Sequence, residues 1–157
     1  MRLGIAFVVC VVAGSLSNAA ASGGSVDVRA QAKGAERVVI ARVKDVSPRF
    51  DVNAFGDSLI VSQSWLEVED SLKGPHSPLL SVEVEGGTIG DLTLRVSDMP
   101  TLRKGERAVF FLDATATGAH KPHRRGLGVL KLDSAGRVAG SSVTVGEVKQ
   151  LVRDALK

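Results

Sequence analysis

The sequence has almost no cysteine. Of its 157 residues only Cys10 is a cysteine, and it lies in the apolar segment at the N-terminus. Disulfide bonds, cysteine nucleophiles and thiolate metal sites are therefore excluded from the rest of the chain. Stability must come from the burial of apolar side chains.

Aromatic residues and excess charge of one sign are scarce as well. The chain has one Trp, no Tyr and five Phe, and its net charge is +3 with acids and bases interspersed. A domain that binds single-stranded nucleic acid displays several aromatic side chains on one face and is usually far more basic. Trp65 and the pair Phe110-Phe111 stand in apolar contexts, so we expect them to pack in the core. The composition argues against a nucleic-acid partner.

Long hydrophobic runs are missing except near the N-terminus. Arg2 precedes the apolar run Leu3 to Val12, and small residues follow as far as Ala21. This pattern is typical of a secretory signal peptide, and the run is too short for a membrane span of about 20 residues. We expect residues 1–21 to be a signal peptide cleaved before Ser22. The mature chain, with a net charge of about +2 after loss of Arg2, would be secreted or periplasmic, with no membrane span.

The remaining chain predicts a flexible lead-in over 22–35 and a single domain over 36–157. From Glu36 onward, short apolar runs rich in Val and Leu alternate with Gly, Pro, Asp and Ser, as in consecutive short strands. The first run predicts a strand buried on both faces and ended by Pro48. The second has a phase shift between Val61 and Trp65 that predicts a bulge or bend. The expected strands are 37–46, 58–72, 79–85, 91–96, 107–112 and 128–132, with 137–139 as a short hairpin arm.

The C-terminus has a different pattern. Thr144 and Glu147 have the spacing of a capping box, and apolar residues then recur at helical spacing over 145–156. One amphipathic helix should cover an open end or side of the sheet. The prediction is a mainly β fold, a small antiparallel barrel of five or six strands with one C-terminal amphipathic helix.

Several segments together resemble a known family. ERVVIARV, LEVEDSLKG, LSVEVEGG and KGERAVFFL occur in the order seen in the oligonucleotide/oligosaccharide-binding barrel (OB-fold). The layout is similar to its exported netrin-module form, used by tissue inhibitors of metalloproteinases and by some secreted bacterial domains. The resemblance covers roughly Ala35 to Leu132 and implies a barrel with an extracytoplasmic binding role. Those inhibitors chelate zinc through an N-terminal cysteine that is missing here, so neither protease inhibition nor any functional residue is transferred.

The stretch HKPHRRG, His120 to Gly126, is the candidate binding surface. It supplies His120, Lys121, His123, Arg124 and Arg125. A metal site of imidazoles needs three or four convergent ligands, the two histidines flank a proline that disfavours a helix, and the cations would repel a metal ion. We expect no metal. The alternatives left open are a solvated basic loop over 118–127, or a contact for an acidic protein or an anionic glycan.

Other motifs point away from catalysis. Glycines in EGGTIGDL, Glu85 to Leu92, could cradle a phosphate only before a helix, but an alternating segment follows, so we expect a turn. There is no G-x-S-x-G motif, and no pair of acidic residues has the spacing of an acid/base couple. We therefore expect no catalytic residue and no cofactor.

The predicted function is that of an exported, non-catalytic binding module. Its partner is expected to be a protein, with a protease or an envelope component as candidates. Two alternatives stay open: a module that binds an anionic glycan or nucleic acid through the 118–127 loop, and a hydrolase of unspecified type. The sequence does not define the oligomeric state.

Overall fold

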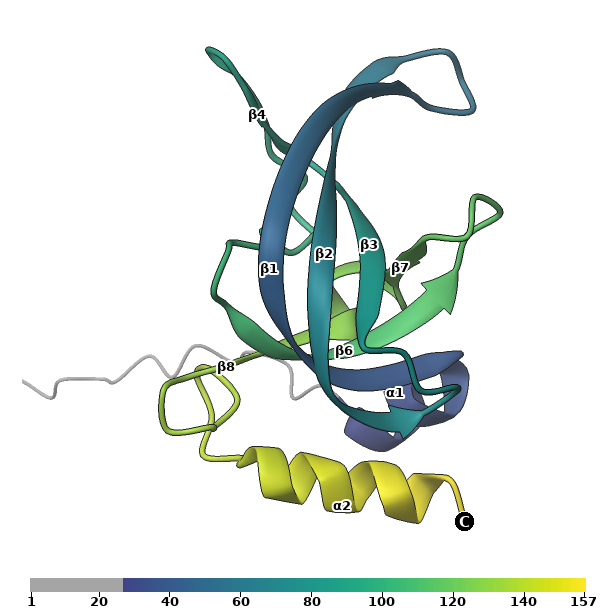
Figure 1. Ribbon diagram of the computed structural model, residues 1–157, viewed down its shortest axis with the longest axis vertical. Coiled ribbons are helices and arrows are strands. Elements are labelled where there is room, and N and C mark those ends of the chain that lie inside the picture. The colour runs from purple at the N-terminus through teal and green to yellow at the C-terminus, as the bar shows by residue number, and fades with distance from the viewer. Residues whose placement is uncertain (1–26) are drawn as a thin grey trace, which may run out of the picture.

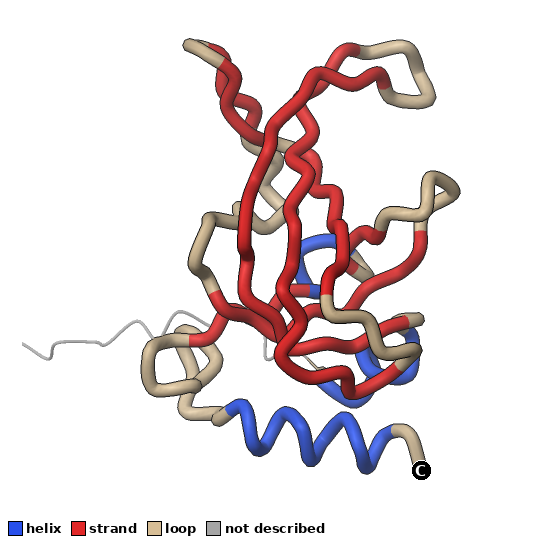
Figure 2. Tube along the Cα trace, viewed as in Figure 1, coloured by secondary structure: helices blue, strands red, loops and turns tan. Residues whose placement is uncertain are grey.

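The computed structural model describes residues 27–157, so the expected signal peptide and its cleavage site lie outside the described residues. The chain forms a mainly β domain with helices packed below the sheet (Figures 1 and 2). The elements are α1 (Val28–Gly34), β1 (Arg37–Val52), β2 (Ser58–Lys73), β3 (Leu79–Glu85), β4 (Gly87–Ile89), β5 (Leu92–Leu94), β6 (Arg107–Ala114), β7 (His120–Pro122), the short 3₁₀ helix η1 (Arg125–Gly128), β8 (Val129–Leu132) and α2 (Val145–Ala155).

The main sheet has six strands and closes into a ring. Its order is β1-β2-β3-β7-β6-β8, and an additional pairing of β1 with β6 closes the ring. All pairings are antiparallel except that of β3 with β7, which is parallel and joins Val82 to His120. The expected mainly β fold with a barrel-like sheet and a C-terminal helix is thus confirmed, with one further helix.

The first strand is longer than the sequence predicted, whereas the second closely matches its expected range. β1 does not end at Pro48 but continues to Val52, and Pro48 pairs with Ser62. Proline is tolerated there because β1 pairs with β6 only over 37–42, which leaves an unpaired edge where a missing N–H costs nothing. The bulge expected in the second strand between Val61 and Trp65 is not present, because β2 pairs regularly with β1 and β3 over these residues. The register of the β1–β2 pair shifts elsewhere, including between Val43 and Asp45 of β1.

Two apolar cores share strands β1 and β6. Val39, Ala41, Phe110 and Leu112 face the inside of the ring, where Leu66, Leu80, Val82 and Val84 join them. The alternate residues of the same two strands, including Val38, Ile40, Val109 and Phe111, face the helices. Burial on both faces of the first strand, inferred from its continuous apolar run, is confirmed.

Residues 28–34 are not a flexible lead-in, and that expectation is wrong for this part of the chain. The Asp27 side chain caps α1 by accepting hydrogen bonds from the amides of Arg29 and Ala30, and Val28 and Ala32 are buried in the second core. At the other end the Lys73 ammonium donates to the carbonyls of Ala32, Lys33 and Ala35 at 2.9, 3.1 and 2.6 Å. The LKG segment, expected only to terminate a strand, therefore also caps a helix.

The C-terminal helix follows the sequence prediction closely. Thr144 and Glu147 form the capping box, and Val148 and Val152 are fully buried against the sheet. Lys149 adds an ion pair of 2.8 Å to Asp70 of β2. Figure 1 shows α2 beneath the ring, on the same side as α1.

The 91–96 prediction needs correction. Only Leu92–Leu94 forms a strand, β5, and it pairs with β4 in a separate two-stranded hairpin rather than with the main sheet. Leu92 was expected to face inward but is 61% exposed. The arm expected at 137–139 is present as isolated bridges that pair Val138 with Leu132 and Arg137 with Thr144.

Candidate functional site

A cleft of about 450 Å³ lies between the far end of the β1–β2 hairpin and the 118–127 loop. The hairpin contributes Val52 and Leu59, and Lys121, Pro122 and Arg124 come from β7 and the turn after it. The cleft opens at the seam of the ring, because β3 and β7 pair at a single position and the strands separate beyond it. The candidate loop therefore borders a concave surface that extends from β7, near the middle of the molecule, toward the β1–β2 hairpin end, which lies opposite α2 (Figure 1).

His120 closes the ring and is not a free ligand. Its main chain pairs with Val82 of β3, and its Nδ1 lies 3.2 Å from the carbonyl oxygen of Ser81. The side chain is thus held by β3, whereas the main chain of β7 also forms a hairpin with β6.

His123 serves as a structural contact between β6 and α1. Its Nδ1 hydrogen-bonds Asp113 at 2.8 Å, and both side chains are largely covered. The Nε2 faces Gly34 of α1, where a Cβ atom would come within 2.6 Å of it. Only glycine permits this approach, and the helix leaves Nε2 no room for a metal ion or a substrate.

Arg125 is already engaged by two carboxylates. It forms a bidentate pair with Asp98 and a further ion pair of 3.1 Å with Glu85, which ties the turn after β7 to β3 and to the 96–100 loop. The guanidinium holds the pKa of Asp98 below its usual range. Arg124 and Arg125 have positive φ angles of 52° and 60°, a region that non-glycine residues rarely adopt, so these contacts hold a strained turn in place.

Of the five candidate residues, Lys121 and Arg124 are the ones whose charged groups are free to bind a partner. Both are exposed, and neither pairs with an acidic side chain among residues 27–157, whereas His123 and Arg125 do. The acids that line the cleft are each bound to a partner: Asp51 and Glu83 to Arg49, Glu85 to Arg125, and Asp113 to His123. Lys121 and Arg124 are therefore the charged side chains of the cleft that have no partner among the described residues.

The hairpin end carries apolar side chains that sequence reasoning did not single out. Phe50, Val52 and Phe55 are 56%, 64% and 91% exposed, and Val52 also lines the cleft. Phe55 lies in the turn between β1 and β2, which Asn53 organises by accepting from the amides of Phe55 and Asp57. We call Phe50, Val52, Phe55, Lys121 and Arg124 the distal surface. The sequence does show two phenylalanines close to a turn, at positions 50 and 55. They were overlooked because the first strand was expected to end before them.

Two of the three aromatic core predictions are confirmed. Phe110 and Phe111 are fully buried, on opposite faces of β6. Trp65 is 39% exposed on the outer side of the ring, so its assignment to the core is wrong. Trp65 lies on β2 between the inward residues Ser64 and Leu66, so strand alternation places its side chain on the outer face.

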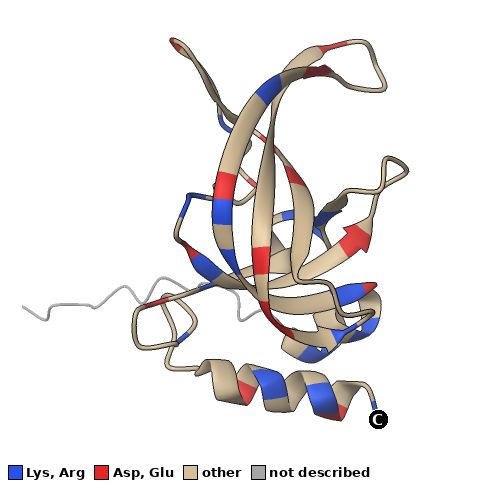
Figure 3. Cartoon of the chain, viewed as in Figure 1, with Lys and Arg blue, Asp and Glu red and all other residues tan. Residues whose placement is uncertain are grey.

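The glycine-rich segment is a hairpin and not a phosphate loop. Gly90, with φ of 57°, forms the turn between β4 and β5, so the expected turn is confirmed. Charged side chains of both signs are interspersed over the visible face rather than gathered on it (Figure 3). Within residues 27–157, no group of three or more His, Asp or Glu side chains is arranged to hold a metal ion. None of the described helices is long and apolar enough to cross a membrane.

Comparison with protein-family models and with curated protein sequences finds no match. The function must therefore be argued from the geometry of the distal surface.

Proposed function

We propose that the protein is an exported, non-catalytic binding module whose partner is another protein. The observation that supports this most is the exposure of Phe50, Val52 and Phe55 together at one end of the β1–β2 hairpin. Large apolar side chains gathered on a projecting loop mark interaction sites in proteins, because each costs free energy in contact with water.

The cleft beside these side chains indicates the chemistry of the partner. Val52 connects the apolar hairpin end to a cleft in which Lys121 and Arg124 have no acidic partner among the described residues. A protein segment that places an apolar side chain against the hairpin and a carboxylate near the two cations would complement both features. Aromatic anchors next to a polar rim are the usual composition of such contacts.

The alternative of a polyanionic glycan or nucleic acid fits this surface less well. Of the five candidate residues only Lys121 and Arg124 are free to bind an anion, and four carboxylates line the same cleft. A polyanion would meet these carboxylates as well as the two cations. The hydrolase alternative loses its most obvious base, since the Nε2 of His123 is covered by α1.

The location of the protein and its resemblance to netrin-module barrels stay proposals. The N-terminal pattern supports export to the periplasm or the exterior, which makes a protease or an envelope component a suitable partner. The resemblance contributes no residue to the distal surface.

A capture experiment with matched variants tests this function. The mature chain is immobilised and exposed to the exported fraction of cells that produce it, and the double variant Phe50→Ser/Phe55→Ser is compared with Leu156→Ser. Leu156 is also exposed, at 41%, but lies at the C-terminal end of α2. We expect one protein to be captured by the wild type and by Leu156→Ser, and at least about tenfold less of it by the double variant. Equal capture by both variants would contradict the proposal.

A further inference from the structure

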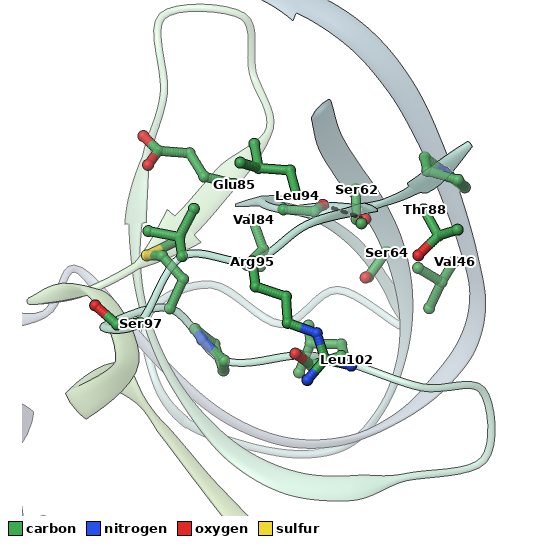
Figure 4. Close-up of a pocket in the computed structure, with 17 residues that line it drawn as sticks. Val46, Ser62, Ser64, Val84, Glu85, Thr88, Leu94, Arg95, Ser97 and Leu102 are labelled. Carbon is green, nitrogen blue, oxygen red and sulfur yellow. Dashed lines mark hydrogen bonds between the residues drawn. The ribbon is translucent and has the colours of Figure 1, made fainter. Parts of the chain in front are cut away.

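A second cavity, of about 420 Å³, lies on the inner side of the sheet (Figure 4). It shares Glu85 and Met99 with the cleft described above but none of the residues of the distal surface. Its walls are the inner faces of β1, β2 and β3 on one side and the segment 86–102 on the other. The β4–β5 hairpin covers it from above, because Gly87 lies directly against Ser62, Ile60 and Pro48. A volume of this size lies within the range of small-molecule sites.

A buried hydroxyl without a partner faces this cavity. The inward residues of β2 are Ile60, Ser62, Ser64 and Leu66, so two serines interrupt an apolar row where the cavity lies. Ser62 donates to the carbonyl of Gly86 at 2.7 Å. Ser64 is completely buried, yet its Oγ has no hydrogen-bond partner among the described residues. Figure 4 shows this oxygen pointing into the cavity. Buried polar groups are nearly always paired, so an orphan at a cavity wall indicates a missing partner.

An exposed cation without an acidic partner among the described residues also lines the cavity. Arg95 is the only cation among its lining residues, and Figure 4 shows its side chain extending into the cavity toward Leu102. The only acid in the lining is Glu85, which is bound by Arg125 at 3.1 Å. No acidic side chain of residues 27–157 lies within ion-pair distance of Arg95.

The rest of the wall combines apolar side chains with hydroxyl-bearing ones. Val84, Leu94, Met99 and Leu102 surround the space between Arg95 and the inner face of β2. Ser62, Thr88, Ser97 and Thr101 also line the cavity, but of all these hydroxyls only that of Ser64 is both buried and without a partner among the described residues. An occupant therefore meets a guanidinium, apolar side chains and several hydroxyls.

We propose that this cavity binds a small organic monocarboxylate that carries a second polar oxygen. Arg95 holds the carboxylate, the apolar side chains of the lining hold the hydrocarbon, and the hydroxyl of Ser64 donates to the second oxygen. This site goes beyond the protein-binding function, and its test requires no partner protein.

Three probe molecules separate the contribution of the carboxylate from those of the second oxygen and of the hydrocarbon chain. The mature chain, labelled with ¹⁵N, is titrated with 8-hydroxyoctanoate, octanoate and octan-1-ol, and binding is followed by the amide shifts of residues around the cavity. We expect saturable shifts at Ser64, Val84 and Leu94 with both acids, tighter binding of the hydroxy acid, and at least about tenfold weaker binding of the neutral alcohol.

Two variants and a control assign the residues. Arg95→Gln should weaken both acids at least about tenfold, while Arg103→Gln, which removes one exposed cation outside the cavity, should leave both affinities unchanged. Ser64→Ala should weaken only the hydroxy acid, to the affinity of octanoate, and should not lower the melting temperature, because the hydroxyl it removes is unpaired.

Three results would overturn the site. The first is the lack of any saturable shift with either acid at millimolar concentration, which would leave water as the partner of Ser64. The second is that octan-1-ol binds as tightly as the acids, or that Arg95→Gln binds the acids as tightly as the wild type does. The third is an unchanged affinity of Ser64→Ala for the hydroxy acid.

Discussion

Lys73 offers a sharp test of how the N-terminal helix is held to the barrel. Its ammonium donates three hydrogen bonds to carbonyls at the C-terminus of α1, which a seven-residue helix cannot satisfy internally. One hydrogen bond to a charged group contributes about 1.5–3 kcal/mol, and a cation at a helix C-terminus adds about 0.3–1 kcal/mol. The three bonds share one ammonium and are not additive. We therefore expect Lys73→Met, which keeps most of the aliphatic stem, to cost about 2–3 kcal/mol.

The assay is urea unfolding of the mature chain combined with amide hydrogen exchange. With a slope of about 2 kcal/mol per molar urea, the midpoint of Lys73→Met should fall by about 1 M, and the amides of α1 should exchange faster than those of β1. Lys121→Met is the control, because Lys121 is exposed and unpaired within residues 27–157, and it should change stability by less than about 0.5 kcal/mol. A loss below about 0.5 kcal/mol for Lys73→Met, with α1 protection unchanged, would refute this reasoning.

Three further predictions concern single contacts. The Arg125 guanidinium lowers the pKa of Asp98, so by NMR titration Asp98 should titrate below the ordinary value of about 3.9 and return to it in Arg125→Gln. Because the folded-state pKa is the lower one, the stabilisation is complete above the unfolded pKa and is lost as pH falls through the folded pKa; an unshifted Asp98 would contradict the pair. The Thr144 hydroxyl caps α2 by accepting a hydrogen bond from the Glu147 amide at 3.2 Å, so Thr144→Ala should lower the free energy of unfolding in urea by about 1 kcal/mol. An unchanged free energy would contradict the capping box. Phe111→Ala empties a fully buried site between sheet and helices and should cost about 3–5 kcal/mol; a loss under 1 kcal/mol would refute its place in the core.

The strands and the C-terminal helix could be predicted because their signals are local. Alternation in β3, a continuous apolar run in β6 and a capping box before α2 each specify burial within a few residues of sequence. The phase shift between Val61 and Trp65 was wrongly interpreted as a bulge, because Ser62 and Ser64 occupy inward positions of a regularly paired strand where apolar residues were expected.

The errors come from contacts between segments distant in sequence. Helix α1 is short and made of small residues, and it is held by Lys73, about 40 residues away along the chain. A proline such as Pro48 predicts the end of a strand, unless it lies on an unpaired edge. Here the edge is unpaired because β6 pairs with β1 only as far as Arg42, which the sequence does not show.

The candidate loop shows the same limit. The sequence identified His120 to Arg125 as a basic segment, and Lys121, Arg124 and Arg125 of this segment line a cleft. Spacing could not show that Asp113 binds His123 or that Asp98 and Glu85 bind Arg125. The structure reduces the five candidate residues to two cations without an acidic partner among the described residues, Lys121 and Arg124. It adds exposed apolar side chains from the β1–β2 hairpin, which the sequence analysis did not include in the candidate site.

Site-specific photocrosslinking in cells is the most direct test of the central claim that the distal surface binds a protein. A photoreactive amino acid is introduced at Phe55 in one variant and at Leu156, on the opposite end of the molecule, in another. The account predicts one discrete crosslinked protein from position 55 and none from position 156, with the yield at 55 reduced when Lys121 and Arg124 are both changed to Gln. No crosslink from position 55, or the same products from both positions, would contradict it.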